Sequence, residues 1–234
     1  WYWQGTTPST KVKNWSVGKS YASTAVGLAI DHGDLDSVEQ PAADFIPAWQ
    51  GTDHEAIRIQ DLLSMSSGLK LDMIADNVTM PLADDMSGLA IDAPLVNPPG
   101  ALWEYNNHSV QAMEPVLRAA TGMPADEYAT EHLFEPMGMD VDWKRDEVGQ
   151  PALFMNAKAT CRDHARFGYL YLNNGCWDGD QLLSTDWIDA ATSPSTAHNR
   201  GYGYWWRLSG ENPTLDSVDL SEKPYGGLHP QAPG

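Results

Sequence analysis

The feature of this sequence that most constrains its fold is a long helical pattern near its beginning. Between residues 16 and 32 the apolar side chains recur at helical spacing, at Tyr21, Ala25, Leu28 and Ala29. Residues spaced in this way share one face of a helix, and the Gly33 that follows them is a common helix end. We therefore expect a helix over residues 16–32 that stops at Gly33.

Other segments carry shorter patterns. Helical spacing returns in four later segments, at residues 60–68, 107–121, 124–134 and 159–173. Ser184 begins a run of good capping residues and predicts one more helix start. The aromatic segment GYGYWWRL, residues 201–208, is the best candidate strand because glycines bound it. Many helices with few strands predict an α+β protein in which helices dominate.

The length and charge of the chain limit its organisation and its partners. A chain of 234 residues suits a single domain, residues 1–234, with its own core. Its 14 basic and 32 acidic residues give a formal net charge of -18, which repels nucleic acids and anionic membranes. The sequence has no apolar run of about 18 residues, so we expect a soluble protein with no membrane partner.

The ends and the cysteines leave the cellular location open. The first residues, WYWQG, resemble the interior of a strand and contain no leader-like pattern, so we expect the domain to start upstream of this sequence. Cys161 and Cys176 do not resemble a metal site, and they could pair in an oxidising compartment or stay reduced. Cytoplasmic and exported locations, and any oligomeric state, are compatible with the sequence.

Several common catalytic patterns are absent from the sequence. It contains no G-x-S-x-G turn of an α/β-hydrolase, no H-E-x-x-H zinc motif and no glycine-rich phosphate loop. The seven histidines are scattered without ligand spacing, so we expect no metal ion. Serine chemistry without a histidine partner remains.

A Ser-x-x-Lys pattern occurs twice. Ser16 and Lys19 stand where the first helix starts, and residues three apart lie side by side on a helix. The lysine amine then takes the hydroxyl proton, provided that burial or nearby cations lower its pKa by roughly 3 units. The alternative is that Ser16 only caps the helix and Lys19 is solvated. The second match, Ser67 to Lys70, contains a glycine at a predicted helix end and fits a turn better.

A loop further along the chain favours catalysis. The segment NPPGALWEYNNHSV, residues 97–110, places Tyr105 and Asn107 between a proline-glycine turn and a helix. A tyrosine on such a loop has its hydroxyl free to point into a cleft. Trp103, Trp205 and Trp206 could line the cleft, although tryptophan is also a common core residue.

Together, S-x-x-K followed by Y-x-N resembles the serine β-lactamase and penicillin-binding superfamily. The resemblance continues in the same order through IRIQDLLSMSSGL, PPGALWEYNN, ATGMPADEYATEHLFEPMGM and NAKATCRDHARFGYLYLNNGCWDGDQLLS. With GYGYWW, these segments are similar to the branch that contains 6-aminohexanoate-dimer hydrolases and family VIII carboxylesterases. The resemblance implies a β-lactamase/transpeptidase-like α+β fold, with a helical region packed on an antiparallel sheet. In that fold, strands from both ends of the chain belong to the sheet, so we expect the sheet to be incomplete in this sequence.

The resemblance also implies roles for four residues. Ser16 matches the acylated nucleophile, Lys19 its general base, and Tyr105 the residue that relays a proton to the leaving group. Asn107 matches an amide that faces the substrate, although an asparagine before a helix is an equally good cap. The resemblance implies no metal and no organic cofactor.

The third motif of the family, K-T-G or a variant, has no convincing match. Neither Gly226–Gly227 nor His229 is followed by a strand before the sequence ends, so we expect this motif beyond residue 234. The leading hypothesis is an enzyme that hydrolyses small esters or amides through an acyl-enzyme. A β-lactamase or D-alanyl-D-alanine carboxypeptidase is the first alternative, and a binding protein without turnover is the second.

Overall fold

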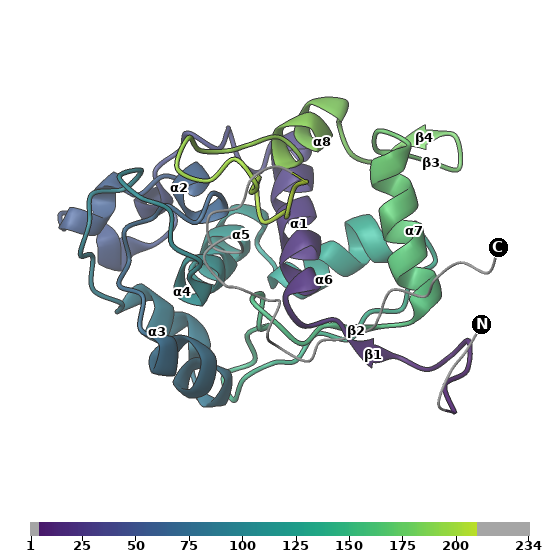
Figure 1. Cartoon of the computed structure of the whole chain (residues 1–234), viewed down its shortest axis with the longest axis horizontal. Coiled ribbons are helices and arrows are strands. Elements are labelled where there is room, and N and C mark those ends of the chain that lie inside the picture. Colours follow the sequence, from purple (N-terminus) through teal and green to yellow (C-terminus); the bar gives the residue numbers. More distant parts are fainter. Residues whose placement is uncertain (1–4, 210–234) are drawn as a thin grey trace, which may run out of the picture.

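A computed structural model describes residues 5–209, and helix α1 (Gly18–His32) runs through the middle of the molecule (Figure 1). Every residue of α1 from Gly18 to Ala29 is buried, so the helix is covered on all sides. The expected end is confirmed, because Gly33 has a φ of 81° and its N–H donates to the carbonyls of Ala29 and Ile30. The start differs slightly, since Ser16 lies in a 3-10 turn, η1 (Trp15–Val17), directly before α1.

The other helices surround α1. Figure 1 shows three short helices on one side of it: α2 (Ile59–Leu63), α3 (Met86–Ile91) and α4 (Asn107–Gln111). Helices that follow in the chain pack against it or cover its ends: α5 (Met113–Thr121), α6 (Ala125–Ala129), α7 (Cys161–Leu172) and α8 (Thr185–Ala191). Short turns join these elements: η2 (Ala42–Asp44), η3 (Pro47–Trp49), η4 (Asp53–Ala56), η5 (Ala75–Thr79), η6 (Met80–Leu82) and η7 (Thr130–Phe134).

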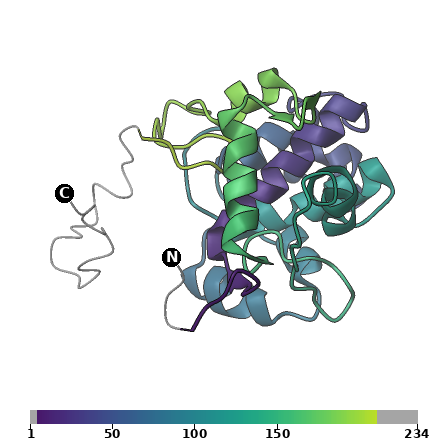
Figure 2. The same ribbon diagram turned by 90° about the vertical axis from the view of Figure 1, so that its right-hand side faces the viewer.

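Helix α7 lies beside α1 in both views of the ribbon (Figures 1 and 2). Two side-chain hydrogen bonds join the helices, one of 2.7 Å between the Tyr21 hydroxyl and His164 Nδ1 and one of 2.8 Å between the Thr24 and Tyr171 hydroxyls. Tyr21 also meets Phe167 edge to face, with ring centroids 4.5 Å apart. These contacts fix the position of α1, whose first turn carries Lys19 and which Ser16 directly precedes in η1.

The strands of the described residues are short and antiparallel. β1 (Val12–Lys13) pairs with β2 (Lys158–Ala159), and β3 (Cys176–Trp177) pairs with β4 (Asp180–Gln181). In the first pair Val12 lies opposite Ala159, which brings the segment before Ser16 next to residues 154–157. A hydrogen bond of 2.9 Å from the Asn14 N–H to the Ala157 carbonyl extends this pairing toward the start of α1.

Two predicted elements are corrected by the structure. Residues 201–208 do not form a strand, because Trp205 has a φ of 58° and only a single bridge joins Tyr202 to Arg207. The helix expected over 60–68 ends at Leu63, and Met65 takes a left-handed φ of 57°. The Trp205 backbone and indole N–H groups instead bond to the carbonyls of Leu63 and Leu62, so tertiary hydrogen bonds replace a strand ladder.

The remaining helix predictions hold with changed boundaries. The pattern at 107–121 becomes α4 and α5, which meet at Ala112, and the pattern at 124–134 becomes α6 followed by the π-helical turn η7. The helix expected over 159–173 is α7, and the predicted cap at Ser184 accepts a hydrogen bond from the Trp187 N–H. The expected third-motif region, Gly226–Gly227 and His229, lies outside the described residues, as does the WYWQ start.

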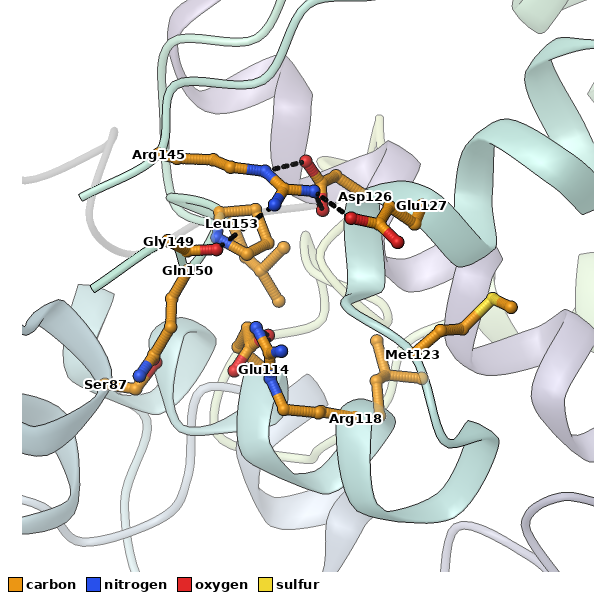
Figure 3. Close-up of polar contacts among 12 residues, drawn as sticks. Ser87, Glu114, Arg118, Met123, Asp126, Glu127, Arg145, Gly149, Gln150 and Leu153 are labelled. Atoms are coloured by element: carbon orange, nitrogen blue, oxygen red, sulfur yellow. Dashed lines mark hydrogen bonds and ion pairs between the residues drawn. The ribbon is translucent and has the colours of Figure 1, made fainter. Parts of the chain in front are cut away.

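An arginine clamp joins α6 to the loop that leads toward β2 (Figure 3). The Arg145 guanidinium donates to both carboxylate oxygens of Asp126 at 2.9 Å and to Glu127 at 2.7 Å. It also donates to the Gly149 carbonyl at 3.3 Å. A forked arginine–carboxylate contact restricts geometry more than a single ion pair does, so the clamp fixes the path of the chain before residues 151–154.

Helix α8 packs closely on α1 at Gly27, where a Cβ would lie 2.5 Å from the Trp187 ring. We expect Gly27→Ala to lower the free energy of unfolding by about 1–3 kcal/mol, because a buried indole has to move. The matched control is Gly168→Ala in α7, where a Cβ meets nothing within 4 Å. That change should raise stability by roughly 0.5–1 kcal/mol through helix propensity. Thermal unfolding of both variants checks the packing, and an unchanged Gly27→Ala midpoint would contradict it.

Candidate active site

Ser16 stands on a strained turn between β1 and α1. The preceding residue, Trp15, has a φ of 49°, which a bulky side chain rarely adopts. Backbone strain of this kind costs about 1–3 kcal/mol and persists where the surrounding structure imposes it. The turn leaves Ser16 exposed on the wall of a cavity of about 450 Å³.

Lys19 lies one helical turn after Ser16, as its spacing predicts. The side chain is 1% exposed, and its ammonium group donates to Ser16 Oγ at 3.1 Å and to the Phe154 carbonyl at 2.5 Å. The solvated-lysine alternative is therefore wrong for Lys19. Ser16 accepts a hydrogen bond from Lys19, and its side chain makes no helix-capping hydrogen bond in η1 or α1.

Burial is the main influence on the charge of this lysine. Loss of solvent lowers the pKa of Lys19 below its ordinary value of 10.5, and the positive charge of Arg207 contributes in the same direction. Interactions with Tyr105 and the negative charge of Asp76 oppose the shift. A lowered pKa increases the fraction of neutral amine, which is the form that accepts a proton from a hydroxyl.

Tyr105 lies beside Ser16 and Lys19, although it is far from both in the sequence. Its ring lines the Ser16 cavity, and its centroid lies 4.9 Å from Lys19 Nζ. The ring packs edge to face against Tyr202, with centroids 6.2 Å apart. The structure thus brings together three of the four predicted site residues, Ser16, Lys19 and Tyr105.

The loop that carries Tyr105 is fixed by its neighbours. The Asn106 side chain accepts from the N–H groups of His108 and Ser109 and donates to the Leu69 carbonyl. The Asp76 carboxylate accepts from the Asn107 N–H at 2.7 Å and faces His108 Nδ1 at 3.0 Å. The cap of α4 is therefore Asn106, and Asn107, the capping candidate of the sequence, is the first residue of the helix.

Asn107 itself does not line the Ser16 cavity. Its side chain is 4% exposed, and its amide donates to the Asp76 carbonyl at 3.3 Å. Its Oδ1 has no partner among the described residues. A substrate-facing role for Asn107 stays a prediction, because this arrangement turns its amide nitrogen toward Asp76.

The carbonyl that accepts a hydrogen bond from Lys19 could not be predicted from the sequence. The buried side chain of Gln111 accepts from the Leu153 N–H at 3.0 Å and donates to the Pro151 carbonyl at 3.0 Å. This clamp fixes the backbone immediately before Phe154. A backbone carbonyl carries no residue-type signature, so only the three-dimensional structure reveals this contact.

Aromatic side chains form a large part of the remaining cavity wall. Trp205 and Trp206 line it, which is one of the two roles that the sequence left open, whereas Trp103 packs against Tyr202 with centroids 5.4 Å apart and does not line the cavity. Trp15, Tyr202 and Arg207 also line it, and the sequence did not indicate them. The bent loop at 201–208 places four of its residues on the cavity wall near Ser16: Tyr202, Trp205, Trp206 and Arg207.

The second Ser-x-x-Lys match has a different structure. Ser67 Oγ lies 2.7 Å from Ser109 Oγ, and Gly68 has a φ of 79°. Lys70 is exposed and lies 4.0 Å from the Asp72 carboxylate. The two side chains form no pair, because the chain bends at Ser67 and Leu69 forms a bridge to Leu95.

Residues 5–209 contain no group of three or more histidine, cysteine or acidic side chains placed to hold a metal ion. Cys161 and Cys176 are both free thiols. None of the helices in this part of the chain is both long and apolar enough to cross a membrane.

Comparison with known proteins gives the family. A sequence model described as Beta-lactamase matches residues 2–225. The chain belongs to the beta-lactamase family. This beta-lactamase-family chain is 22% identical over 209 residues to a 6-aminohexanoate-dimer hydrolase from Paenarthrobacter ureafaciens, covering 81% of this chain and 53% of the relative. It therefore spans about half the length of that curated relative.

Solved structures confirm the α+β beta-lactamase/transpeptidase-like fold. A candidate beta-lactamase from Bacteroides dorei superposes with a TM-score of 0.75 and 22% identity, over 86% of this chain and 67% of that one. A penicillin-binding protein from Bacillus halodurans gives a TM-score of 0.65 and 19% identity, over 85% and 70%. The helix-rich architecture with short antiparallel strands fits a family fold whose sheet is incomplete here.

The buried amine of Lys19 makes stability depend on pH in a predictable direction. Its pKa is lower in the folded protein than the ordinary 10.5, so the unfolded chain binds more protons between these two values. We expect the wild type to gain stability relative to Lys19→Met as the pH rises through this interval. Denaturant unfolding at several pH values measures the difference. Lys13→Met, at an exposed lysine in β1, is the control. A pH-independent difference between wild type and Lys19→Met would contradict the burial argument.

Proposed function

We propose that this chain is the helical part of a serine hydrolase that cleaves small esters or amides through an acyl-enzyme, of the 6-aminohexanoate-dimer hydrolase or carboxylesterase type. The observation that carries the proposal is the 3.1 Å contact between the buried Lys19 amine and Ser16 Oγ on a cavity wall. A buried amine beside an exposed hydroxyl is the arrangement that activates a serine nucleophile without histidine.

The mechanism follows from the positions of three side chains. Neutral Lys19 accepts the hydroxyl proton as Ser16 Oγ attacks the carbonyl carbon, and N–H groups at the first turn of α1 stabilise the oxyanion. Tyr105, beside Lys19, gives its hydroxyl proton to the departing alcohol or amine and takes up the proton that Lys19 accepted from Ser16. Water then attacks the acyl-enzyme, with the same groups moving its proton, and Ser16 is regenerated.

The cavity and the relatives support small acyl substrates. Trp15, Trp205 and Trp206 provide apolar walls that fit an aliphatic chain. Two relatives carry the name 6-aminohexanoate-dimer hydrolase, one from Paenarthrobacter ureafaciens and one candidate from Bacillus anthracis with a TM-score of 0.75 and 22% identity. A linear amide is therefore included among the test substrates.

The nucleophile is tested with Ser16→Ala in the full-length protein. We expect the wild type to hydrolyse a p-nitrophenyl short-chain ester or a linear amide, and Ser16→Ala to lose roughly 10⁴-fold or more in kcat. Ser67→Ala, in the second Ser-x-x-Lys match, is the control and should retain activity. Ester cleavage that survives in Ser16→Ala would exclude the mechanism. Preferential cleavage of a chromogenic cephalosporin would favour a β-lactamase, and binding without turnover would favour a binding protein.

The base is tested by the pH dependence of kcat/KM. Because the pKa of Lys19 is lowered from 10.5, the neutral amine is populated at lower pH, and activity should rise with pH and level off below 10.5. Lys19→Ala should lose about 10²–10⁴-fold in acylation rate and lose this pH dependence. Acylation kinetics on the same ester measure both effects, and a near-normal rate in Lys19→Ala would remove it as the base.

A further inference from the structure

The β1–β2 pair, which lies below the start of α1 in Figure 1, forms one side of a second cavity. This β1–β2 cavity has a volume of about 270 Å³. Its lining residues are Lys13, Asp142, Trp143, Lys144, Asn156 and Lys158. None of them lines the Ser16 cavity, so the two cavities are separate sites.

Positive charge is concentrated at the β1–β2 cavity. The sequence has 14 basic and 32 acidic residues, yet three of the six lysines within residues 5–209 line this one cavity. One carboxylate, that of Asp142, also lines it. Lys11 engages that carboxylate at 2.9 Å and the neighbouring carboxylate of Asp140 at 2.6 Å, which reduces their repulsion of an anion. The cavity is therefore locally cationic in a strongly acidic chain.

Lys13 and Lys158 face each other across the strand pair. They are direct partners in the antiparallel register, and directly opposed side chains lie on the same face of a sheet. Like charges in this position destabilise a strand pair. Within residues 5–209 neither ammonium group has a carboxylate or hydrogen-bond partner, whereas that of Lys144 donates to the Pro81 carbonyl at 2.6 Å. An anion between Lys13 and Lys158 would remove their repulsion.

Two buried polar atoms in the lining of this cavity also lack partners. Trp143 Nε1 and Asn156 Oδ1 make no hydrogen bond within the described part of the chain. Unpaired buried polar atoms are uncommon in folded proteins, and a water molecule or an ion often accounts for them. Their presence beside three lysines favours a polar, charged occupant over an apolar one.

We propose that the β1–β2 cavity binds a phosphate group between Lys13 and Lys158, either as free phosphate or as part of a small phosphomonoester. A lysine ammonium group binds phosphate as a point charge, and two of them match the roughly -1.5 to -2 charge of a phosphate group at pH 7. The phosphate oxygens can also reach the indole N–H of Trp143 through an ordered water. Surface charges farther away than about 8 Å are largely screened at physiological salt, so the local lysines decide the binding.

Calorimetric titration of the full-length protein in phosphate-free buffer, at constant ionic strength, tests the proposal. Inorganic phosphate and glycerol 2-phosphate are the two ligands, and the one that binds more tightly identifies the source of the phosphate group. We expect saturable binding at one site, with a Kd that rises roughly 10- to 100-fold in the double variant Lys13→Gln, Lys158→Gln. Lys13→Gln alone should give an intermediate Kd. Succinate should bind more weakly, because its two charges lie farther apart.

The matched control is the double variant Lys70→Gln, Arg200→Gln. Both residues are exposed and lie outside the β1–β2 cavity, and the variant removes the same two positive charges. It should bind phosphate as the wild type does. Equal Kd values for the wild type and for Lys13→Gln, Lys158→Gln would overturn the proposal, as would the absence of saturable binding. Succinate binding as tight as that of phosphate would overturn the assignment of a phosphate group.

Thermal unfolding provides an independent measurement. Phosphate should raise the unfolding midpoint of the wild type more than sodium chloride of the same ionic strength does, because it binds the folded state. The double variant Lys13→Gln, Lys158→Gln should lose this increase. Ser16→Ala should retain it, since Ser16 does not line this cavity. The phosphate site is thus tested separately from the proposed hydrolysis, and an equal increase in the lysine double variant would contradict it.

Discussion

Burial of the Lys19 amine is the interaction on which the rest of the site depends. An ammonium group removed from water is costly unless polar partners replace its hydration. Ser16 Oγ and the Phe154 carbonyl supply two such partners, and the protein fixes both of them. The Gln111 clamp fixes the carbonyl side, and the strained turn at Trp15 fixes the serine side. Because the amine is desolvated, its neutral form becomes accessible, which links packing directly to the proposed chemistry.

The centre of the molecule is built to keep this lysine buried. Helix α1 is enclosed on all sides, with α7 bonded along it and the Trp187 ring packed directly on Gly27. The β1–β2 pairing then closes the open end of α1 by joining Asn14 to Ala157. Small residues along α1 allow these close approaches, and larger side chains would push the covering helices away from the lysine.

The electrostatics of the surface and of the cavity differ in sign. The formal net charge of -18 repels anions at long range, whereas the cavity contains Arg207 at its wall and Lys19 beneath Ser16. Arg207 also disfavours the protonated form of Lys19. Screening at physiological salt confines the long-range repulsion from the surface charge to about 8 Å.

The sequence by itself determined the elements with a strong local signal. The helical spacing and Gly33 defined α1, the Ser-x-x-Lys spacing placed Lys19 beside Ser16, and the proline-glycine turn placed Tyr105 on a loop. These predictions depend on neighbours within a few residues, where backbone geometry fixes distances. Only the tertiary structure decided that the 201–208 segment bends into the cavity, that Asn106 is the cap, and that Phe154 and Arg207 reach the site. Those contacts join residues that are far apart in the chain, through backbone groups or through side chains that line the cavity. Contacts of this kind leave no local pattern in the sequence, so they could not be predicted from it.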